Sequence, residues 1–258
     1  MTSENDSALL SKVPAITIGF WIAKIFATTL GETAGDTVSM SWNLGYLIGS
    51  AIFFAILIVL VILQIRARAF HPFVYWATII ASTTAGTTLA DYATRSLGIG
   101  YSGGSLILAA LVLVSLGSWH MVEGKISSGQ IVRARTEAFY WTTITFSQTL
   151  GTALGDWAAD PATLGLGYLG GALLFGGLIA LVALLYFTTS INRVALFWAA
   201  FILTRPLGAT VGDFLDKPLA KGGLSLSRPL ASAALTIAIV LIVWLTGRKS
   251  RAVPPNAA

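Results

Sequence analysis

Residues 21–36, WIAKIFATTLGETAGD, set a pattern that recurs along the whole chain. The stretch opens on a tryptophan and closes on an aspartate fifteen residues later, and the same spacing returns three more times. Four matches at one spacing indicate tandem structural repeats. The anchors of the four repeats are Trp21, Trp76, Trp141 and Trp198, and the aspartates that follow them are Asp36, Asp91, Asp156 and Asp213.

Small residues lie at the tenth and fourteenth positions after each tryptophan. Residues four apart share one face of a helix. In lipid, such small-xxx-small faces let two helix backbones approach closely and pack by van der Waals contact. Of these eight positions, seven are glycine and one is Ala90. We therefore predict helix packing through Gly31, Gly35, Gly86, Gly151, Gly155, Gly208 and Gly212.

The composition places the chain in a membrane. Of 258 residues, 55% are hydrophobic and 10% are charged, whereas an ordinary soluble domain carries about 25% charged residues. The apolar residues fall in runs of about 20, the length that crosses a bilayer as a helix. This predicts an all-α integral membrane protein with about eight transmembrane helices, near residues 16–37, 44–65, 72–94, 102–121, 137–158, 164–187, 194–215 and 227–247.

Each repeat contains two of these spans, so successive repeats enter the membrane in the same direction. We predict four tandem two-helix repeats in a parallel, pseudo-symmetric bundle, with the aspartate-bearing helices inside and the more apolar helices facing lipid. The single membrane domain is expected to cover residues 14–247, between cytoplasmic tails at 1–13 and 248–258. The repeats lie approximately at residues 14–66, 71–121, 136–188 and 193–247.

The basic residues indicate an orientation. Ten of the sixteen Lys and Arg fall on the side of the two termini, so the positive-inside rule predicts that both termini are cytoplasmic. Trp119 is expected in the aromatic belt on that side. Because the basic residues are scattered among membrane-flanking loops, the bilayer is the expected partner and nucleic acid is not. We expect no cofactor, and the oligomeric state is left open.

The Trp-to-Gly-Asp pattern in two-span units resembles a family of bacterial membrane-anchored proteins known chiefly by a tandem repeat of unknown function. The resemblance covers the chain from about residue 14 to residue 247. It implies the architecture described above and a location in the bacterial inner (cytoplasmic) membrane. It implies no activity, so a mechanism has to come from the residues.

A polar stripe accompanies the small-residue face. Positions seven, eleven and fifteen after each tryptophan share one helical face, and this face should point into the bundle or a water-filled cavity. At 1.5 Å per residue, the aspartates fall near the outer ends of the helices, where they would ring a vestibule. The predicted substrate or ion pathway consists of Glu32, Asp36, Asp91, Asp156, Asp213, Thr28, Thr83, Thr87, Gln148 and Thr152.

Lys24, Glu32 and Arg205 carry charges within predicted spans. A charge at mid-membrane costs about 2.5–3.5 kcal/mol by insertion scales, so these residues need partners or water. Glu32 and Arg205 lie one turn apart in repeat register on the first and fourth repeats, and we predict that they form an ion pair. Lys24 lies nearby and is expected to reach water or a polar group of another helix. A structural interpretation also exists, in which the pair only fixes helix register.

The stripe favours a transporter or exporter of a small cation, such as a divalent metal moved with proton coupling. Carboxylate and hydroxyl oxygens suit manganese, magnesium or calcium, although the metal stays unknown. The alternatives are a non-transporting membrane sensor or scaffold module and a transporter of a small organic solute. No catalytic residues are assigned and an enzyme is not expected, because the sequence has no serine–histidine arrangement and no His-Glu-x-x-His motif.

Overall fold

The computed structural model describes residues 11–129 and 131–251. The described chain is helical, and its long helices match the predicted spans to within a few residues. The last helix runs past the predicted end at residue 247, while residues 1–10 and 252–258 of the predicted tails lie outside the described residues. The helices are α2 (Ile18–Asp36), α3 (Gly45–Arg66), α4 (Pro72–Asp91), α5 (Gly100–Glu123), α6 (Ala134–Ala159), α7 (Gly167–Thr188), α8 (Arg193–Asp216) and α9 (Arg228–Arg251).

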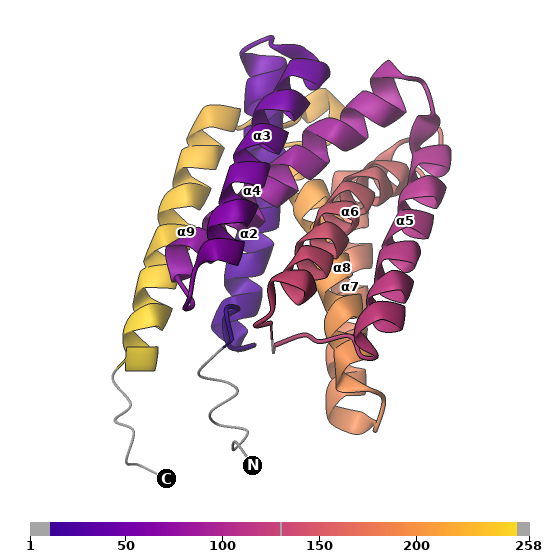
Figure 1. The fold of residues 1–258 in the computed structure, drawn as a ribbon. Coiled ribbons are helices and arrows are strands. Elements are labelled where there is room, and N and C mark those ends of the chain that lie inside the picture. The colour runs from indigo at the N-terminus through magenta and orange to yellow at the C-terminus, as the bar shows by residue number, and fades with distance from the viewer. Residues whose placement is uncertain (1–10, 130, 252–258) are drawn as a thin grey trace, which may run out of the picture.

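The contacts between helices form a closed ring with a second layer around it. Figure 1 shows the bundle from the side, with α9 and α5 at opposite edges of the view. The inner ring consists of α2, α4, α6 and α8, in which α2 contacts α4, α4 contacts α6, α6 contacts α8, and α8 returns to α2. Each outer helix packs against the inner helix of the following repeat, so that α3 covers α4, α5 covers α6 and α7 covers α8. The last outer helix, α9, packs on α2 and joins the fourth repeat to the first.

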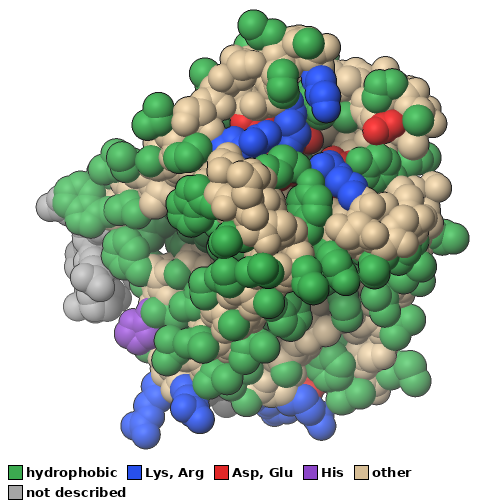
Figure 2. All heavy atoms as spheres, turned by 90° about the horizontal axis from the view of Figure 1, so that it is seen from above, with side chains coloured by type: hydrophobic (Ala, Val, Ile, Leu, Met, Phe, Trp, Pro, Cys, Tyr) green, Lys and Arg blue, Asp and Glu red, His purple; other side chains and the backbone are tan. Residues whose placement is uncertain are grey.

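The two layers differ in polarity. Five of the described helices, α3, α5, α7, α8 and α9, are long and apolar enough to cross a membrane. The mean hydropathy reaches 2.9 in α3, where only 17% of the most apolar window is buried, and α8 is the only one of the five that is mostly buried. Hydrophobic side chains cover much of the surface in Figure 2. The more polar helices therefore lie inside, and the more apolar helices α3, α5, α7 and α9 lie on the outside of the bundle, as predicted.

Glycines set the diameter of the inner ring. In each inner helix, the glycine at position ten faces the residue at position seven of the next helix. A Cβ added to Gly86 would lie 2.9 Å from the backbone carbon of Gln148, which is closer than nonbonded atoms approach. The four contacts follow one rule around the ring, pairing Gly31 with Thr83, Gly86 with Gln148, Gly151 with Arg205, and Gly208 with Thr28.

The two ends of the ring differ in chemistry, and we name them the aromatic end and the carboxylate end. The inner helices begin at the aromatic end, where each repeat tryptophan packs with the aromatic residue that directly precedes it in sequence. The hydroxyl groups of Tyr75 and Tyr140 lie 2.8 Å apart there. Trp119, expected at the lipid interface, is instead fully buried against Trp198, with 5.8 Å between ring centroids. The aspartates of the repeats define the carboxylate end.

Candidate cation site at the carboxylate end

The polar stripe faces the centre of the inner ring and is buried along its length. None of its side chains is more than 5% exposed. The stripe therefore points into the bundle, and the aspartates are buried in the described structure instead of lining an open vestibule. The buried stripe consists of Thr28, Thr83, Gln148 and Arg205 in one layer, Glu32, Thr87 and Thr152 in the next, and Asp36, Asp91, Asp156 and Asp213 beyond them.

Arg205 occupies the middle of the ring. Its Nη2 lies 3.0 Å from Glu32 Oε2. The same nitrogen donates to Thr87 Oγ1 at 2.6 Å and to the hydroxyl of Thr152. The arginine of the fourth repeat thus contacts position eleven in each of the other three repeats. The ion pair expected from repeat register is present, and the two threonines join it because all four helices converge on one guanidinium.

Two cations for which the sequence predicted no role divide the four aspartates into pairs. Arg95 bridges Asp91 and Asp156, with Nε 3.0 Å from Asp91 Oδ1 and Nη2 2.9 Å from Asp156 Oδ2. Lys217 bridges the other two aspartates, which belong to the first and fourth repeats. Each cation lies four residues after an aspartate of its own repeat, a spacing that places both side chains on one helical face. That spacing could have identified Arg95 and Lys217 as partners.

The ammonium of Lys217 lies between carboxylates. It hydrogen-bonds Asp36 Oδ2 and lies 2.8 Å from Asp213 Oδ1. Lys217 follows the last residue of α8. Burial lowers the pKa of its ammonium, but Asp213, Asp36 and Asp216 raise it by more, so the pKa stands well above the ordinary value of lysine. The side chain therefore stays charged at neutral pH.

Asp216 and Arg228 extend this second pair. Asp216 is only 6% exposed. Its Oδ2 lies 2.6 Å from Arg228 Nε, and the same nitrogen lies 3.8 Å from Asp36 Oδ2. The reason is that α8 continues to Asp216 and the start of α9 returns beside it. Figure 2 shows basic and acidic side chains gathered together within a surface that is otherwise largely hydrophobic.

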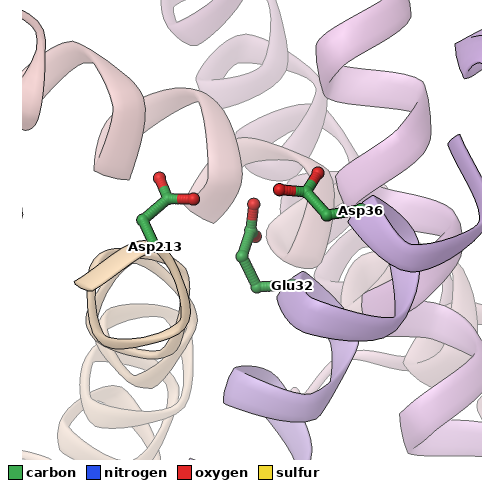
Figure 3. A group of neighbouring side chains, drawn as sticks. All are labelled: Glu32, Asp36 and Asp213. Atoms are coloured by element: carbon green, nitrogen blue, oxygen red, sulfur yellow. The ribbon is translucent and has the colours of Figure 1, made fainter. Parts of the chain in front are cut away.

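Glu32, Asp36 and Asp213 form a group that could hold a metal ion. One carboxylate oxygen from each lies within 4.8 Å of the others, and all three residues are buried. Figure 3 shows Glu32 and Asp36 extending from α2 toward Asp213 on α8. Hard cations such as Mg²⁺, Mn²⁺ and Ca²⁺ prefer carboxylate oxygens. The group lies where the first and last repeats meet, so it exists only once the ring is closed.

Carboxylates outnumber cations in this network. The ion pairs at the carboxylate end and the central pair join six carboxylates to four basic side chains. With every group ionised, two negative charges are left over in a buried region, where an uncompensated charge is costly. One divalent cation or two protons would restore neutrality. The acids are Glu32, Asp36, Asp91, Asp156, Asp213 and Asp216, and the bases are Arg95, Arg205, Lys217 and Arg228.

The path toward the aromatic end is closed. Lys24, expected to reach water or a polar group, is fully buried, and its Nζ lies 4.2 Å from the ring centroid of Phe201. Ile79 and Ile144 occupy the equivalent positions on α4 and α6 and are also fully buried. One turn away, the side-chain amide of Gln148 finds no hydrogen-bond partner in the described part of the chain. The predicted pathway therefore ends in a packed, mostly apolar layer.

The comparisons with known proteins identify a repeat without an activity. The family model described as Repeat of Unknown Function (DUF347) matches the chain four times, over residues 19–70, 74–125, 139–192 and 196–252. These matches coincide with the four helix pairs of the ring. No curated protein and no solved structure matches the chain.

Proposed function

We propose that this chain, which belongs to the family of the Repeat of Unknown Function (DUF347), is a membrane transporter of a small cation, with a divalent metal as the favoured substrate. The observation that carries the proposal is the buried group of Glu32, Asp36 and Asp213, whose oxygens lie within 4.8 Å of one another. The three carboxylates are paired with Arg205 and Lys217, so a substrate cation would take the place of a cation of the chain. Intramembrane ionisable residues usually mark a transport path.

The excess of two negative charges suggests what the site exchanges. A divalent cation would neutralise it, and so would two protons. Loading the site with either species leaves the buried network with the same net charge. An exchange of one divalent cation for two protons would therefore avoid moving an uncompensated charge through the bilayer, which is the proton coupling that we propose.

In this proposal, the ammonium of Lys217 competes with the substrate cation for the carboxylates. Its ammonium contacts Asp36 and Asp213, two of the three proposed ligands. A substrate cation has to displace it, after which Lys217 would retain Asp216, whose Oδ1 lies 3.8 Å from its Nζ. Lysine suits this role because its charge sits on a flexible four-carbon stem. When the substrate leaves, the ammonium returns and keeps the carboxylates from repelling one another.

The closed centre favours a carrier over an open channel. Arg205 fills the ring beneath the carboxylates, and the layer of Lys24 and Phe201 lies beyond it. Transport would require the helices to separate around this point, with the Glu32–Arg205 pair broken or moved. Alternating access by rocking of repeats around a fixed site is a common solution in transporters built from repeats.

We further propose that the aromatic end faces the cytoplasm of a bacterial cell, so that the carboxylate end opens outward. The positively charged loops support this orientation by the positive-inside rule. The basic residues of that end include Lys12, Arg66, Arg68, Lys125, Arg133, Arg135 and Arg193.

Metal-dependent stability tests the proposal. A ligand that binds only the folded protein stabilises it by about 2.7 kcal/mol at a hundredfold excess over its Kd. Thermal unfolding of the purified protein is followed during titration with Mn²⁺, Mg²⁺ and Ca²⁺. At least one of these ions should raise the Tm by about 5–10 °C. Glu32→Gln and Asp36→Asn should each abolish that rise.

Asp91→Asn is the matched control, because Asp91 holds the same repeat position as Asp36 but lies outside the three-carboxylate group. This variant should keep the metal-dependent rise. The stabilising ion is then tested for flux into vesicles that contain the reconstituted protein and a trapped indicator dye. A wild-type protein that no metal stabilises, or an equal response from Asp36→Asn and Asp91→Asn, would refute the assignment.

A non-transporting scaffold is the second candidate, and the packed centre favours it. Each inner helix meets the next at glycines that leave no room for a methyl group, and the axis is filled from the aromatic layer to Arg205. A scaffold would use its buried charges to fix helix register. It would bind no ion, and vesicles would show no flux with any cation in the panel.

A further inference from the structure

A pocket of about 560 Å³ lies at the aromatic end, away from the candidate cation site. It is formed by the last turns of α5, the loop that follows and the first turns of α8. The two helices come from different layers. The outer helix α5 packs on α6, whereas α8 belongs to the inner ring and is covered by α7. The walls are mainly apolar and include Leu116, Ile126, Ala199 and Ile202.

The polar groups of this pocket include a buried donor without an acceptor. Trp198 lines it and is only 4% exposed, yet its indole Nε1 has no hydrogen-bond partner in the described chain. An indole nitrogen can only donate a hydrogen bond. His120 and Lys125 also line the pocket and are exposed to solvent. The side-chain oxygen of Asn192, another lining residue, is already engaged by the backbone amides of Val194 and Ala195.

A second pocket provides an internal comparison. It measures about 680 Å³ and lies at the start of α2 and α4, beside the end of α9. Trp76 lines this pocket at the same repeat position at which Trp198 lines the first. Phe70, six residues before Trp76, takes the place of Asn192. Among the residues whose side chains the structure describes, no charged residue lines the second pocket. Within that part of the chain, the repeat provides the apolar walls and the first pocket adds basic groups.

We propose that the first pocket binds an anionic phospholipid. The apolar walls fit an acyl chain, Lys125 and His120 fit the phosphate, and the buried indole of Trp198 donates to an oxygen of the headgroup or its ester linkage. Anionic lipids are attracted to basic pockets between transmembrane helices, and this end of the molecule carries the basic loops. The site is independent of the proposed cation transport, because it shares no residue with the carboxylate cluster.

Native mass spectrometry of the detergent-purified protein tests the proposal. Phosphatidylglycerol is the probe, and phosphatidylcholine with the same acyl chains is the neutral comparison. We expect at least one phosphatidylglycerol to remain bound under conditions that remove phosphatidylcholine. Lys125→Gln should weaken its binding by about fivefold, the effect of one basic side chain near a lipid surface. Trp198→Phe should also weaken it, because the indole donor is lost while the ring is retained.

Two matched variants separate the site from general effects. Arg68→Gln removes a basic side chain from the same end of the molecule but from neither pocket, and Trp76→Phe changes the equivalent tryptophan in the apolar pocket. Both should bind phosphatidylglycerol as the wild type does. Equal losses in Lys125→Gln and Arg68→Gln would overturn the proposal in favour of diffuse surface charge. Equal binding of phosphatidylcholine would overturn it, and so would competition by millimolar inorganic phosphate, which would indicate a small-anion site. Should Trp198→Phe fail to fold, Lys125→Gln and Arg68→Gln decide the question.

Discussion

The two aspartate pairs of the carboxylate end occupy equivalent places in the ring but differ in their chemistry. On one side, Asp91 and Asp156 share a single partner, Arg95. On the other side, Asp36 and Asp213 share Lys217. The second side also receives Glu32 and Asp216 as additional carboxylates, and Arg205 and Arg228 as additional cations.

The difference shows that the repeats supply a symmetric frame and that a few substitutions make one site within it. Arg95 presents a planar guanidinium that holds two carboxylates in fixed geometry, whereas Lys217 presents a mobile point charge. Glu32 stands where the second and third repeats have threonine. The first pair therefore resembles a structural clamp, while the second combines excess negative charge with a cation that can be displaced.

The largest expected effect comes from removing the glutamate that distinguishes the two sides. Glu32→Gln leaves Arg205 buried without a counter-charge and should lower the free energy of unfolding by about 3–5 kcal/mol. Asp91→Asn on the other side should cost about 1 kcal/mol or less, because Arg95 is partly exposed and keeps Asp156. Denaturation of the detergent-solubilised variants gives both values. The double variant Glu32→Gln with Arg205→Gln should lose less than the sum of the single changes, and strict additivity would argue against coupling.

Glycine substitutions test whether the helices of the inner ring pack equally tightly on both sides, although the charged groups of the two sides differ. Gly86→Ala and Gly208→Ala lie in helices of opposite sides, and each added methyl group would meet the next inner helix. Each change should destabilise the protein by about 1–3 kcal/mol, as overpacking does. Gly117→Ala, on the outer helix α5 with no atom within 4 Å of the added carbon, should be neutral or stabilising by up to about 1 kcal/mol. Thermal unfolding of the three variants checks the order, and a cost confined to one side would show that the frame is not symmetric.

The smallest expected effect is on cation affinity. Lys217→Gln removes the competing ammonium, whose charge-assisted hydrogen bonds are worth about 1.5–3 kcal/mol each. The apparent affinity for the stabilising metal should therefore rise about tenfold, equivalent to about 1.4 kcal/mol. Arg95→Gln should leave the affinity unchanged, since Arg95 contacts none of the three proposed ligands. Metal titrations of the two variants distinguish the cases. If Lys217→Gln lowers the affinity, Lys217 supports the site instead of competing for it.

Much of the architecture could be predicted because it follows from the spacing of residues along the chain. The Trp-to-Asp interval defined the repeats, the length of the apolar runs defined the helices, and the small-residue face defined which helices meet. Register also placed Glu32 opposite Arg205, since a closed ring makes the first and last repeats neighbours. These inferences rest on helix geometry, which is the same in every repeat.

Other features depended on side-chain placement that no spacing specifies. The aspartates were expected around an open vestibule, but Arg95 and Lys217 fold back over them and close it. No spacing indicated that the start of α9 brings Arg228 against Asp216. Lys24 was expected to reach a polar group and instead lies over Phe201.

The sequence by itself determined a four-repeat helical membrane bundle with a polar stripe inside, because helical periodicity and apolar length are local properties of the chain. Only the tertiary structure decided that each outer helix covers the next repeat, that α9 closes the ring on α2, and that Glu32, Asp36 and Asp213 converge. The physical reason is that these arrangements depend on contacts between residues far apart in sequence. The buried carboxylates pair with the basic side chains that the closed ring brings near them.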